Sequence, residues 1–392
     1  MGARSLFKVV AVLSLTAAVT LSSCGLVQEE KTARQLPPAP RELSFLACGD
    51  VLLARGPGRR AAEIGSRPLL EHVRGLVSGA DIAFANLETP ISERGKPYPG
   101  KPPGITFRAD PDTLDGVAWA GFDVVSLANN HMNDHGPRAL ADTLEHLDAA
   151  GIARAGAGRD LEEASQPALI EVDGQLVAVL SYAEPVWSAT VARSGARARV
   201  LTRVETRMTG QEPLWTSRDP DRASSSLAGL APAYVKSMQA DVRRVLATAK
   251  PEYLFVSVHW GDEYQPFPRA FQKTFGRAAI DAGATAVLGH HPHVLQGVEH
   301  YQNGLILYSL GNFVFDMAED ETYETAAFRF YLDKGRIRRL EAIPVRIARR
   351  LYAPAIAVGK DGRAILDKLA ARSKPLGTAL SIEGGIAFLD LD

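Results

Sequence analysis

The sequence predicts an α/β fold whose strands carry ligand-binding side chains at their carboxyl ends. Short apolar runs alternate with segments whose apolar residues recur at helical spacing, which is typical of βαβ units. Several of these apolar runs end in polar residues suited to bind a metal or transfer a proton. The composition is that of a globular protein, since 46% of the 392 residues are hydrophobic. The formal net charge of -1 gives no sign of a nucleic-acid partner, and we expect none.

The first strands and helices follow one another closely. Apolar runs predict strands in ELSFLACGD, DIAFANLE and FDVVSLANNH, and helical spacing predicts helices in RPLLEHVRGLVSGA, DPDTLDGVAWAG and GPRALADTLEHLDAAG. A short strand, IARAGAG, comes next. The segment RGKPYPGKPPGITF is rich in Pro, Gly and Lys and is expected to be a loop. Two further strands flank Asp173-Gly174, which is a hairpin signal.

The second half of the core repeats this alternation. APAYVKSMQADVRRVLATAK and PRAFQKTFGRAAIDAG predict helices, and PEYLFVSVHWGDEY and ATAVLGHHPH contain buried strands. Hairpins are expected at Gln302-Asn303-Gly304 and at Asp333-Lys334-Gly335, with a short helix in GRAILDKLAARS. Residues 43–318 thus form the predicted core, with an insertion or long loop at 187–230. Residues 319–392 are expected to complete the same domain as part of a second sheet.

The N-terminus has the features of an exported lipoprotein. Basic Arg4 and Lys8 precede an uncharged, largely apolar stretch from Val9 to Leu21, which has the size of a signal-peptide apolar region and is too short to span a bilayer. The following Leu-Ser-Ser-Cys looks like a bacterial lipobox, which makes Cys24 the candidate lipidated residue. An ordinary secretory leader or an uncleaved anchor is the alternative.

We therefore expect residues 1–23 to be a signal peptide and 24–42 a lipidated flexible tether. The lipid would anchor the protein to a membrane of the cell envelope, in the periplasm or at the cell surface. Cys48 is the only other cysteine, so a lipidated Cys24 leaves no intramolecular disulfide. Cys48 itself is expected to be a small buried hydrophobe.

Polar side chains follow five of the predicted strands, and together they suit a metal site. They are Asp50; Asn86 and Glu88; Asn129, Asn130 and His131; His259; and His290, His291 and His293. Each alone has an ordinary structural explanation, such as a helix cap, a turn or a hydrogen-bonded histidine. Imidazole nitrogens with carboxylate and amide oxygens suit one or two divalent ions, namely Mn, Fe or Zn, in a hydrolytic centre.

The His-Pro-His segment is the strongest single signal. Pro292 is expected to hold the preceding residue extended, so that His291 and His293 face one pocket while His290 points elsewhere. The other histidines carry weaker signals: His72 and His146 are expected on helix surfaces, His300 in a hairpin strand, and His135 is left open.

The motifs FLACGD, ANLETP, SLANNHMNDHG, VSVHWGDEY and GHHPHVLQGVE together resemble the CapA-type poly-γ-glutamate capsule synthesis family, over about Leu43 to Asp316. The resemblance implies a β-sandwich with flanking helices, similar to calcineurin-like metallophosphoesterases. It implies metal ligands at Asp50, Glu88 (bridging), Asn130, His259, His291 and His293. His131 would protonate a leaving group or steady the transition state, and the pocket would be lined by Asn86, Asn129, Gly311 and Asn312.

Two positions depart from the wider phosphoesterase pattern. That pattern begins with Asp-x-His, but Leu52 stands two residues after Asp50, so one ligand of the first ion is missing. Its second motif usually carries Asp, where this chain has Glu88.

The resemblance implies a surface-anchored protein of capsule, exopolysaccharide or poly-γ-glutamate biosynthesis. As a hydrolase, it would use a metal-bound hydroxide against a phosphoester or amide of an envelope polymer or its precursor, with His131 as general acid. Capsule-synthesis membrane proteins are the expected protein partners. One alternative is a non-catalytic protein that guides an anionic polymer for export through basic residues in 94–101 and 193–207. Another is a zinc peptidase of cell-wall peptide, which gives Asn130 and His131 no role.

The lipobox interpretation predicts the result of one substitution. Cys24→Ser removes the only thiol at the expected lipidation site and should release the protein from the envelope fraction into the soluble fraction. Unchanged fractionation of the variant would rule out lipidation at this residue.

Overall fold

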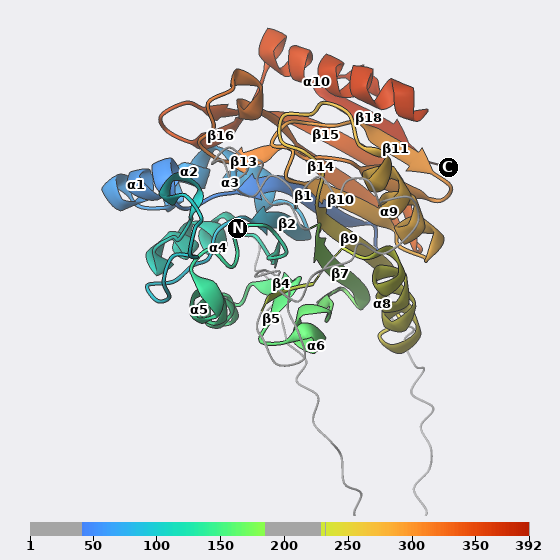
Figure 1. Cartoon of the computed structure of the whole chain (residues 1–392). Coiled ribbons are helices and arrows are strands. Elements are labelled where there is room, and N and C mark those ends of the chain that lie inside the picture. Colours follow the sequence, from blue (N-terminus) through green and yellow to red (C-terminus); the bar gives the residue numbers. More distant parts are fainter. Residues whose placement is uncertain (1–40, 185–228, 232, 392) are drawn as a thin grey trace, which may run out of the picture.

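Two β-sheets packed face to face, with helices on their outer faces, form the architecture of the protein (Figure 1). The computed structural model describes residues 41–184, 229–231 and 233–391. The expected leader, lipidation site and most of the 187–230 insertion therefore lie outside the described residues. The predicted α/β sandwich with flanking helices is confirmed.

The first sheet has ten strands, and its main path runs β17-β18-β15-β14-β1-β2-β3-β4. Strands β1 to β4 are parallel to one another, whereas β14 is antiparallel to β1. Its members are β1 (Leu43–Val51), β2 (Ile82–Leu87), β3 (Val124–Ser126), β4 (Ala153–Ala155), β13 (Asn312–Val314), β14 (Glu324–Asp333), β15 (Arg336–Ala348), β16 (Ala353–Ile356), β17 (Ser381–Glu383) and β18 (Ile386–Asp390).

The second sheet has six strands in the order β11-β12-β10-β9-β7-β6, and the central β7, β9, β10 and β12 are parallel. They are β6 (Ala168–Val172), β7 (Gln175–Ala183), β9 (Tyr253–His259), β10 (Ala286–His290), β11 (Val298–Tyr301) and β12 (Gly304–Leu307). Two short strands, β5 (Ala157–Gly158) and β8 (Gly229–Leu230), pair separately.

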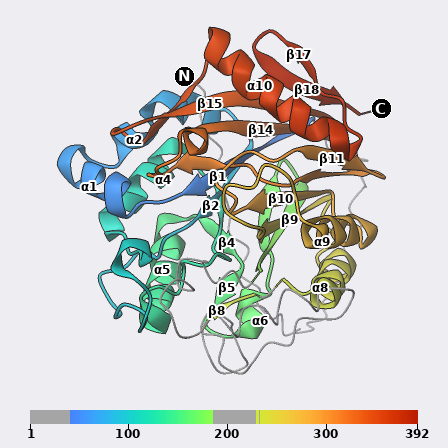
Figure 2. The ribbon, with the colours of Figure 1, turned by 45° about the horizontal axis from the view of Figure 1, so that its top comes forward.

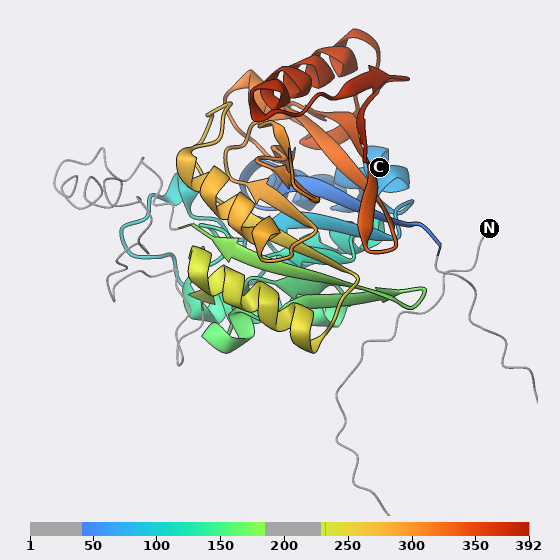
Figure 3. The same ribbon diagram turned by 90° about the vertical axis from the view of Figure 1, so that its right-hand side faces the viewer.

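Helices cover the outer faces of both sheets. Figure 2 shows α4 and α5 on one side of the paired sheets and α8 and α9 on the other, and in Figure 3 α8 and α9 face the viewer. The α-helices are α1 (Arg55–Ile64), α2 (Arg67–Leu70), α3 (Arg74–Val77), α4 (Leu114–Ala120), α5 (Gly136–Ala150), α6 (Leu161–Ala164), α8 (Val235–Thr248), α9 (Ala270–Asp281) and α10 (Gly359–Ser373). The 3₁₀ turns are η1 (Glu71–Val73), η2 (Pro103–Ile105), η3 (Pro111–Thr113), η5 (Asp320–Tyr323) and η6 (Lys374–Leu376). Among the described helices, none has the length and apolar character that crossing a bilayer requires.

Aromatic rings join the two sheets at the centre of the molecule. Phe45 of β1 stacks on Phe255 of β9 with ring centroids 3.9 Å apart, and both side chains are fully buried. Separate apolar clusters lie between the first sheet and α3 to α5, and between the second sheet and α8 and α9. Because the central strands are covered on both faces, their sequences are continuous apolar runs rather than alternating ones.

Most predicted elements are confirmed, including the alternation in the first half, the three hairpins and the C-terminal helix. The expectation that the last strands join a second sheet is wrong, because β14 pairs with β1 and extends the first sheet. The expected helix in RPLLEHVRGLVSGA is broken into α2, η1 and α3. The φ angles of Leu70 and Val73 are both −114°, away from the ideal helical value, and Leu70, Val73 and Val77 all lie in one core.

Helix α1 follows β1 directly and was not predicted. Its sequence, RGPGRRAAEI, is rich in glycine and arginine and has too few apolar residues to show helical periodicity.

Asp81 ties the start of β2 to the start of β1. Its carboxylate accepts hydrogen bonds from the backbone N–H and hydroxyl of Ser44, at 2.8 and 2.7 Å, and from Arg41 at 2.6 Å. Burial alone would raise the pKa of Asp81, but the hydrogen bonds from Arg41 and Ser44 outweigh it and hold the pKa below its usual value.

We expect Asp81→Asn to lower the free energy of unfolding by about 1 kcal/mol at pH 7. Because the pKa of Asp81 is lowered in the folded state, its contribution is present above the unfolded pKa of about 4 and is lost as the pH falls through the folded value. Urea denaturation at pH 7 and pH 3 should therefore show a difference from the native protein that shrinks at pH 3. Asp173→Asn is the matched control, since exposed Asp173 also binds Arg41. An equal loss at both pH values would contradict this account.

Candidate metal centre

The carboxyl ends of strands from both sheets meet at one buried site. The first sheet contributes Asp50 from the end of β1, Glu88 just after β2, and residues 129–131 after β3. The second sheet contributes His259 at the end of β9 and residues 290–293 at the end of β10. The site lies across the junction of the two sheets, at the carboxyl ends of strands as expected. Register places Asp50 beside Asn86 and His290 beside His259.

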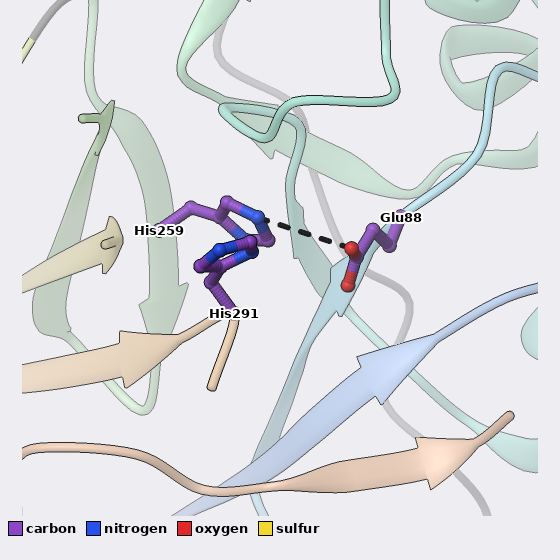
Figure 4. Close-up of side chains that lie close together, drawn as sticks. All are labelled: Glu88, His259 and His291. Atoms are coloured by element: carbon purple, nitrogen blue, oxygen red, sulfur yellow. Dashed lines mark ion pairs between the residues drawn. The ribbon is translucent and has the colours of Figure 1, made fainter. Parts of the chain in front are cut away.

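Two groups of potential ligands share the Glu88 carboxylate. One consists of Glu88, His259 and His291, and the other of Asp50, Glu88 and His293; within each group the ligand atoms lie within 4.8 Å of one another. Glu88 Oε1 is 3.8 Å from Nε2 of both His259 and His293. Figure 4 shows the imidazoles of His259 and His291 next to each other and facing Glu88.

Glu88 is the most unusual side chain of the site. It is fully buried, and among the described residues neither of its carboxylate oxygens has a hydrogen-bond partner. Burial raises its pKa well above the usual value, and the nearby Asp50 carboxylate raises it further. A buried carboxylate without a partner is costly, and a cation bound between the two ligand groups would offset that cost. The donor set of carboxylate oxygens and imidazole nitrogens therefore fits divalent metal ions.

Asn130 completes the group that contains His259. Its Oδ1 atom lies 3.0 Å from His259 Nε2, so an amide oxygen, an imidazole nitrogen and the Glu88 carboxylate face one another. Burial lowers the pKa of His259 and of His291 well below the usual value, and neighbouring histidines lower it further. Both rings are therefore neutral at pH 7, the state in which imidazole binds metals.

The Oδ1 atom of Asp50 is held by two side chains, and its Oδ2 atom accepts from the His291 N–H at 3.3 Å. Its Oδ1 atom lies 2.9 Å from Asn86 Nδ2 and 2.9 Å from His290 Nδ1. Burial alone would raise the pKa of Asp50, but the contact with His290 outweighs it and the pKa is lowered. The expectation that His290 points away from the site is therefore wrong, and this side chain supports Asp50 from behind.

The His-Pro-His segment reaches the site by a different backbone path from the expected one. His291 and His293 both face the ligand cluster, as predicted, but their φ angles are +95° and +59°. The chain is therefore not extended there, because an extended strand has negative φ. Positive φ is also a strained conformation for residues other than glycine. The turn after His290 brings all three imidazoles close to the two carboxylates, which an extended strand could not do.

Several predicted pocket residues make hydrogen bonds to residues of the site. Asn312 Oδ1 accepts a hydrogen bond from His293 Nδ1 at 2.8 Å, which leaves Nε2 directed at Glu88. Asn129 donates to the Leu87 carbonyl at 2.8 Å and accepts from the His131 N–H at 3.2 Å. In metal sites, such partners fix the orientation of the side chains that bind the ion directly.

Gly311 supports β1 through its backbone. Its carbonyl accepts from the Asp50 N–H at 3.0 Å, and its φ of +69° favours glycine. A Cβ atom on Gly49 would lie 2.0 Å from the same carbonyl oxygen, so only glycine fits there as well.

The comparison with known proteins agrees with these motifs. A family model described as "Bacterial capsule synthesis protein PGA_cap" matches residues 44–317. The chain belongs to this family. The resemblance to CapA-type proteins is thereby confirmed.

Named relatives of this PGA_cap protein come from several bacteria. It is 28% identical to "Capsule biosynthesis protein CapA" of Bacillus anthracis, over 86% of this chain and 75% of that protein. It is 26% identical to "PGA biosynthesis protein CapA" of Bacillus subtilis (strain 168), over 89% of this chain and 83% of that protein. A probable polyglutamine synthesis accessory protein of Mycobacterium tuberculosis is 29% identical, over 69% of this chain and 67% of its own length.

Two solved structures are distant likenesses of this chain. A sulfate thiohydrolase SoxB of Thermus thermophilus has a TM-score of 0.36 at 13% identity and covers 80% of this chain and 46% of its own. A second protein of Thermus thermophilus, TT1561, has a TM-score of 0.35 at 10% identity and covers 73% of this chain and 94% of its own. Scores this low have no bearing on the activity of this PGA_cap protein.

Sequence reasoning missed two residues around His131. Asp134 Oδ2 lies 2.8 Å from His131 Nδ1 and accepts from the Phe107 N–H at 2.6 Å. The Phe107 ring stacks on the His131 ring with centroids 3.8 Å apart. The spacing of three residues between His131 and Asp134 was the only available signal for Asp134, and nothing local marks Phe107.

His131 lies at the edge of the cluster, with Nε2 3.9 Å from Glu88 Oε1. Burial lowers the pKa of His131 to about 4, while Asp134 acts in the opposite direction.

Leu52, at the position where the wider pattern has a histidine, packs in an apolar cluster with Ala54, Phe107 and Phe315. His72 is exposed and His300 is exposed on a hairpin strand, as predicted. Cys48 is fully buried, which agrees with its expected role as a small hydrophobe.

The shared carboxylate predicts how metal binding responds to substitution. Glu88→Gln keeps the shape of the side chain but removes the charge common to both ligand groups, so we expect the purified variant to lose bound metal in elemental analysis. His300→Ala, which removes an exposed histidine outside the cluster, is the control and should bind like the native protein. Affinity should fall as the pH is lowered, because protons compete for the raised-pKa carboxyl of Glu88. Full metal content in Glu88→Gln would contradict the assignment.

Proposed function

We propose that the protein is a metal-dependent hydrolase of capsule or poly-γ-glutamate biosynthesis that works at the cell envelope. The observation that carries the proposal is the buried Glu88 carboxylate, which has no hydrogen-bond partner among the described residues and is shared by two ligand groups. Membership of the capsule synthesis family and the names of its relatives support the biological process.

Two sets of residues would hold the ions. Asp50, Glu88 and His293 would bind one, and Glu88, Asn130, His259 and His291 the other. Divalent ions bound there supply Lewis-acid chemistry, by polarising the group to be cleaved and lowering the pKa of a water nucleophile. Leu52 offers no ligand to the first set, so this set has fewer protein ligands than the second.

His131 is the proposed proton carrier. Asp134 accepts from Nδ1–H, which fixes the tautomer and leaves Nε2 facing the cluster. Because its pKa is lowered to about 4, the ring is neutral at pH 7. It therefore acts first as a hydrogen-bond or proton acceptor at Nε2, and serves as an acid toward the leaving group only after gaining a proton there. Phe107 shields one face of the ring from water.

The proposed substrate is a phosphoester or amide of an envelope polymer or its precursor. Lipidation at Cys24 would place the site beside that polymer and beside capsule-synthesis membrane proteins. The relatives' printed names, which mention capsule and PGA biosynthesis, support a polymer of this kind.

A non-catalytic role in guiding the polymer is the competing proposal. Residues 193–207, one of its two basic segments, lie outside the described residues. In the other segment, the Lys101 ammonium contacts the site itself, so this charge is not available to a passing polymer. A zinc peptidase would leave Asn130 and His131, which both lie at the cluster, without a function.

The hydrolase proposal is tested by measuring turnover after metal loading. The metal-loaded protein is assayed against a panel of phosphoesters and γ-glutamyl peptides. We expect His131→Gln to lower kcat by about 10²–10⁴-fold with unchanged metal content, while His72→Gln, on an exposed histidine, stays at the native level.

Metal-loaded native protein that cleaves no member of the panel, or full activity in His131→Gln, would contradict the proposal. Polymer export that survives His291→Ala in cells would instead favour the polymer-guiding role.

A further inference from the structure

Lys101 reaches the metal centre from a separate loop. It lies between β2 and α4, and its Nζ atom donates to the Asn130 carbonyl at 2.9 Å. The same ammonium pairs with Asp134 Oδ1 and lies 3.5 Å from His131 Nδ1. All three contacts involve the turn that carries Asn130 and His131.

The contacts of Lys101 are largely shielded from solvent. The Lys101 side chain is 17% exposed and the Asp134 side chain 2% exposed. A lysine ammonium in such a place needs acceptors in fixed positions, because desolvation of the charge is costly. An exposed surface pair would have no such requirement.

The rest of the loop is fastened to the same turn. The Lys96 N–H donates to the His135 carbonyl at 3.1 Å, and the Tyr98 N–H donates to the Asp134 carbonyl at 2.8 Å. The Phe107 N–H binds Asp134 Oδ2, and the Phe107 ring stacks on His131. The loop and the turn therefore form one unit, with Lys101 as its charged contact.

Lys101 determines which carboxylate oxygen of Asp134 faces His131. Its ammonium occupies Oδ1, so Oδ2 is the oxygen that faces His131 Nδ1. Its bond to the Asn130 carbonyl holds the residue whose side-chain oxygen faces His259. One lysine thus supports both the proposed proton carrier and a proposed metal ligand.

We propose that Lys101 is a positioning residue for this site, which orients His131 through Asp134 and holds Asn130 through its backbone carbonyl. The functional part of this inference rests on the proposed roles of His131 and Asn130. A direct role in binding substrate is less suited to Lys101, because its ammonium already donates to the Asn130 carbonyl and pairs with the Asp134 carboxylate.

The test compares variants that differ in charge and position. Lys101→Met keeps the length of the side chain without its charge, Lys101→Arg keeps the charge, and Lys96→Met changes an exposed lysine of the same loop. We expect Lys101→Met to lower metal affinity and kcat by about 10–100-fold, with KM changed by less than about twofold. Lys101→Arg should restore part of the loss, and Lys96→Met should match the native protein.

A double-mutant cycle isolates the route through Asp134. If Lys101 acts through that carboxylate, Lys101→Met should cost much less kcat in an Asp134→Asn background than in the native one. The His131 Nδ1–H proton resonance, recorded at one pH, should shift or vanish in Lys101→Met. Lys101→Gln, which retains an N–H donor, replaces Lys101→Met if that variant unfolds.

Unchanged metal affinity and an unchanged His131 resonance in Lys101→Met would overturn the proposal. A raised KM with native kcat would also overturn it, because that result identifies a substrate-binding lysine. Native protein that hydrolyses nothing, combined with the expected resonance and metal-affinity changes, would support the positioning role while rejecting the hydrolase.

Discussion

A carboxylate removed from water at the junction of two sheets is the constraint on which this site depends. Within the described part of the chain, Glu88 has no hydrogen-bond donor beside it, although Asp50 lies nearby. Such a group is tolerated only with a cation or a proton as its companion. Neutral imidazoles surround it on the side of the second sheet, and they offer lone pairs rather than positive charge. The arrangement could therefore hold a metal ion, since the imidazoles with lowered pKa give Glu88 no positive partner.

Several side chains of the site are in turn held by a neighbouring residue. Asn312 holds His293, His290 and Asn86 hold Asp50, and Asp134 holds His131. These supporting contacts come from the same strand ends and turns as the ligands, so the fold orients the side chains before any ion binds. The arrangement also explains why amides are frequent here. An amide can accept from one neighbour and donate to another, as Asn312 does toward His293 and the Thr322 carbonyl.

The sequence predicted the strand ends well because their signals are local. An apolar run that stops at Asp50, Glu88 or His259 can be recognised from a few residues. The two-sheet arrangement was predicted only through the family resemblance, because the residues of a strand do not show which sheet that strand joins. His291 and His293 were placed correctly for the wrong reason, since Pro292 suggested an extended path and the backbone has positive φ instead. Lys101 was noted only as part of a basic segment and Phe107 gave no signal, because their contacts with the turn near residue 131 depend on how a long loop folds back.

The pairing of β1 with β14 has a consequence for how the protein is made. Every proposed ligand precedes residue 294, yet the strand that carries Asp50 is flanked on one side by residues 328–332. A nascent chain that has only just exposed His293 would hold all its ligands and still lack this neighbouring strand. The edge of β1 beside β14 is therefore covered only once the carboxyl-terminal hairpin has formed. Truncation before β14 would leave this edge of β1 unpaired.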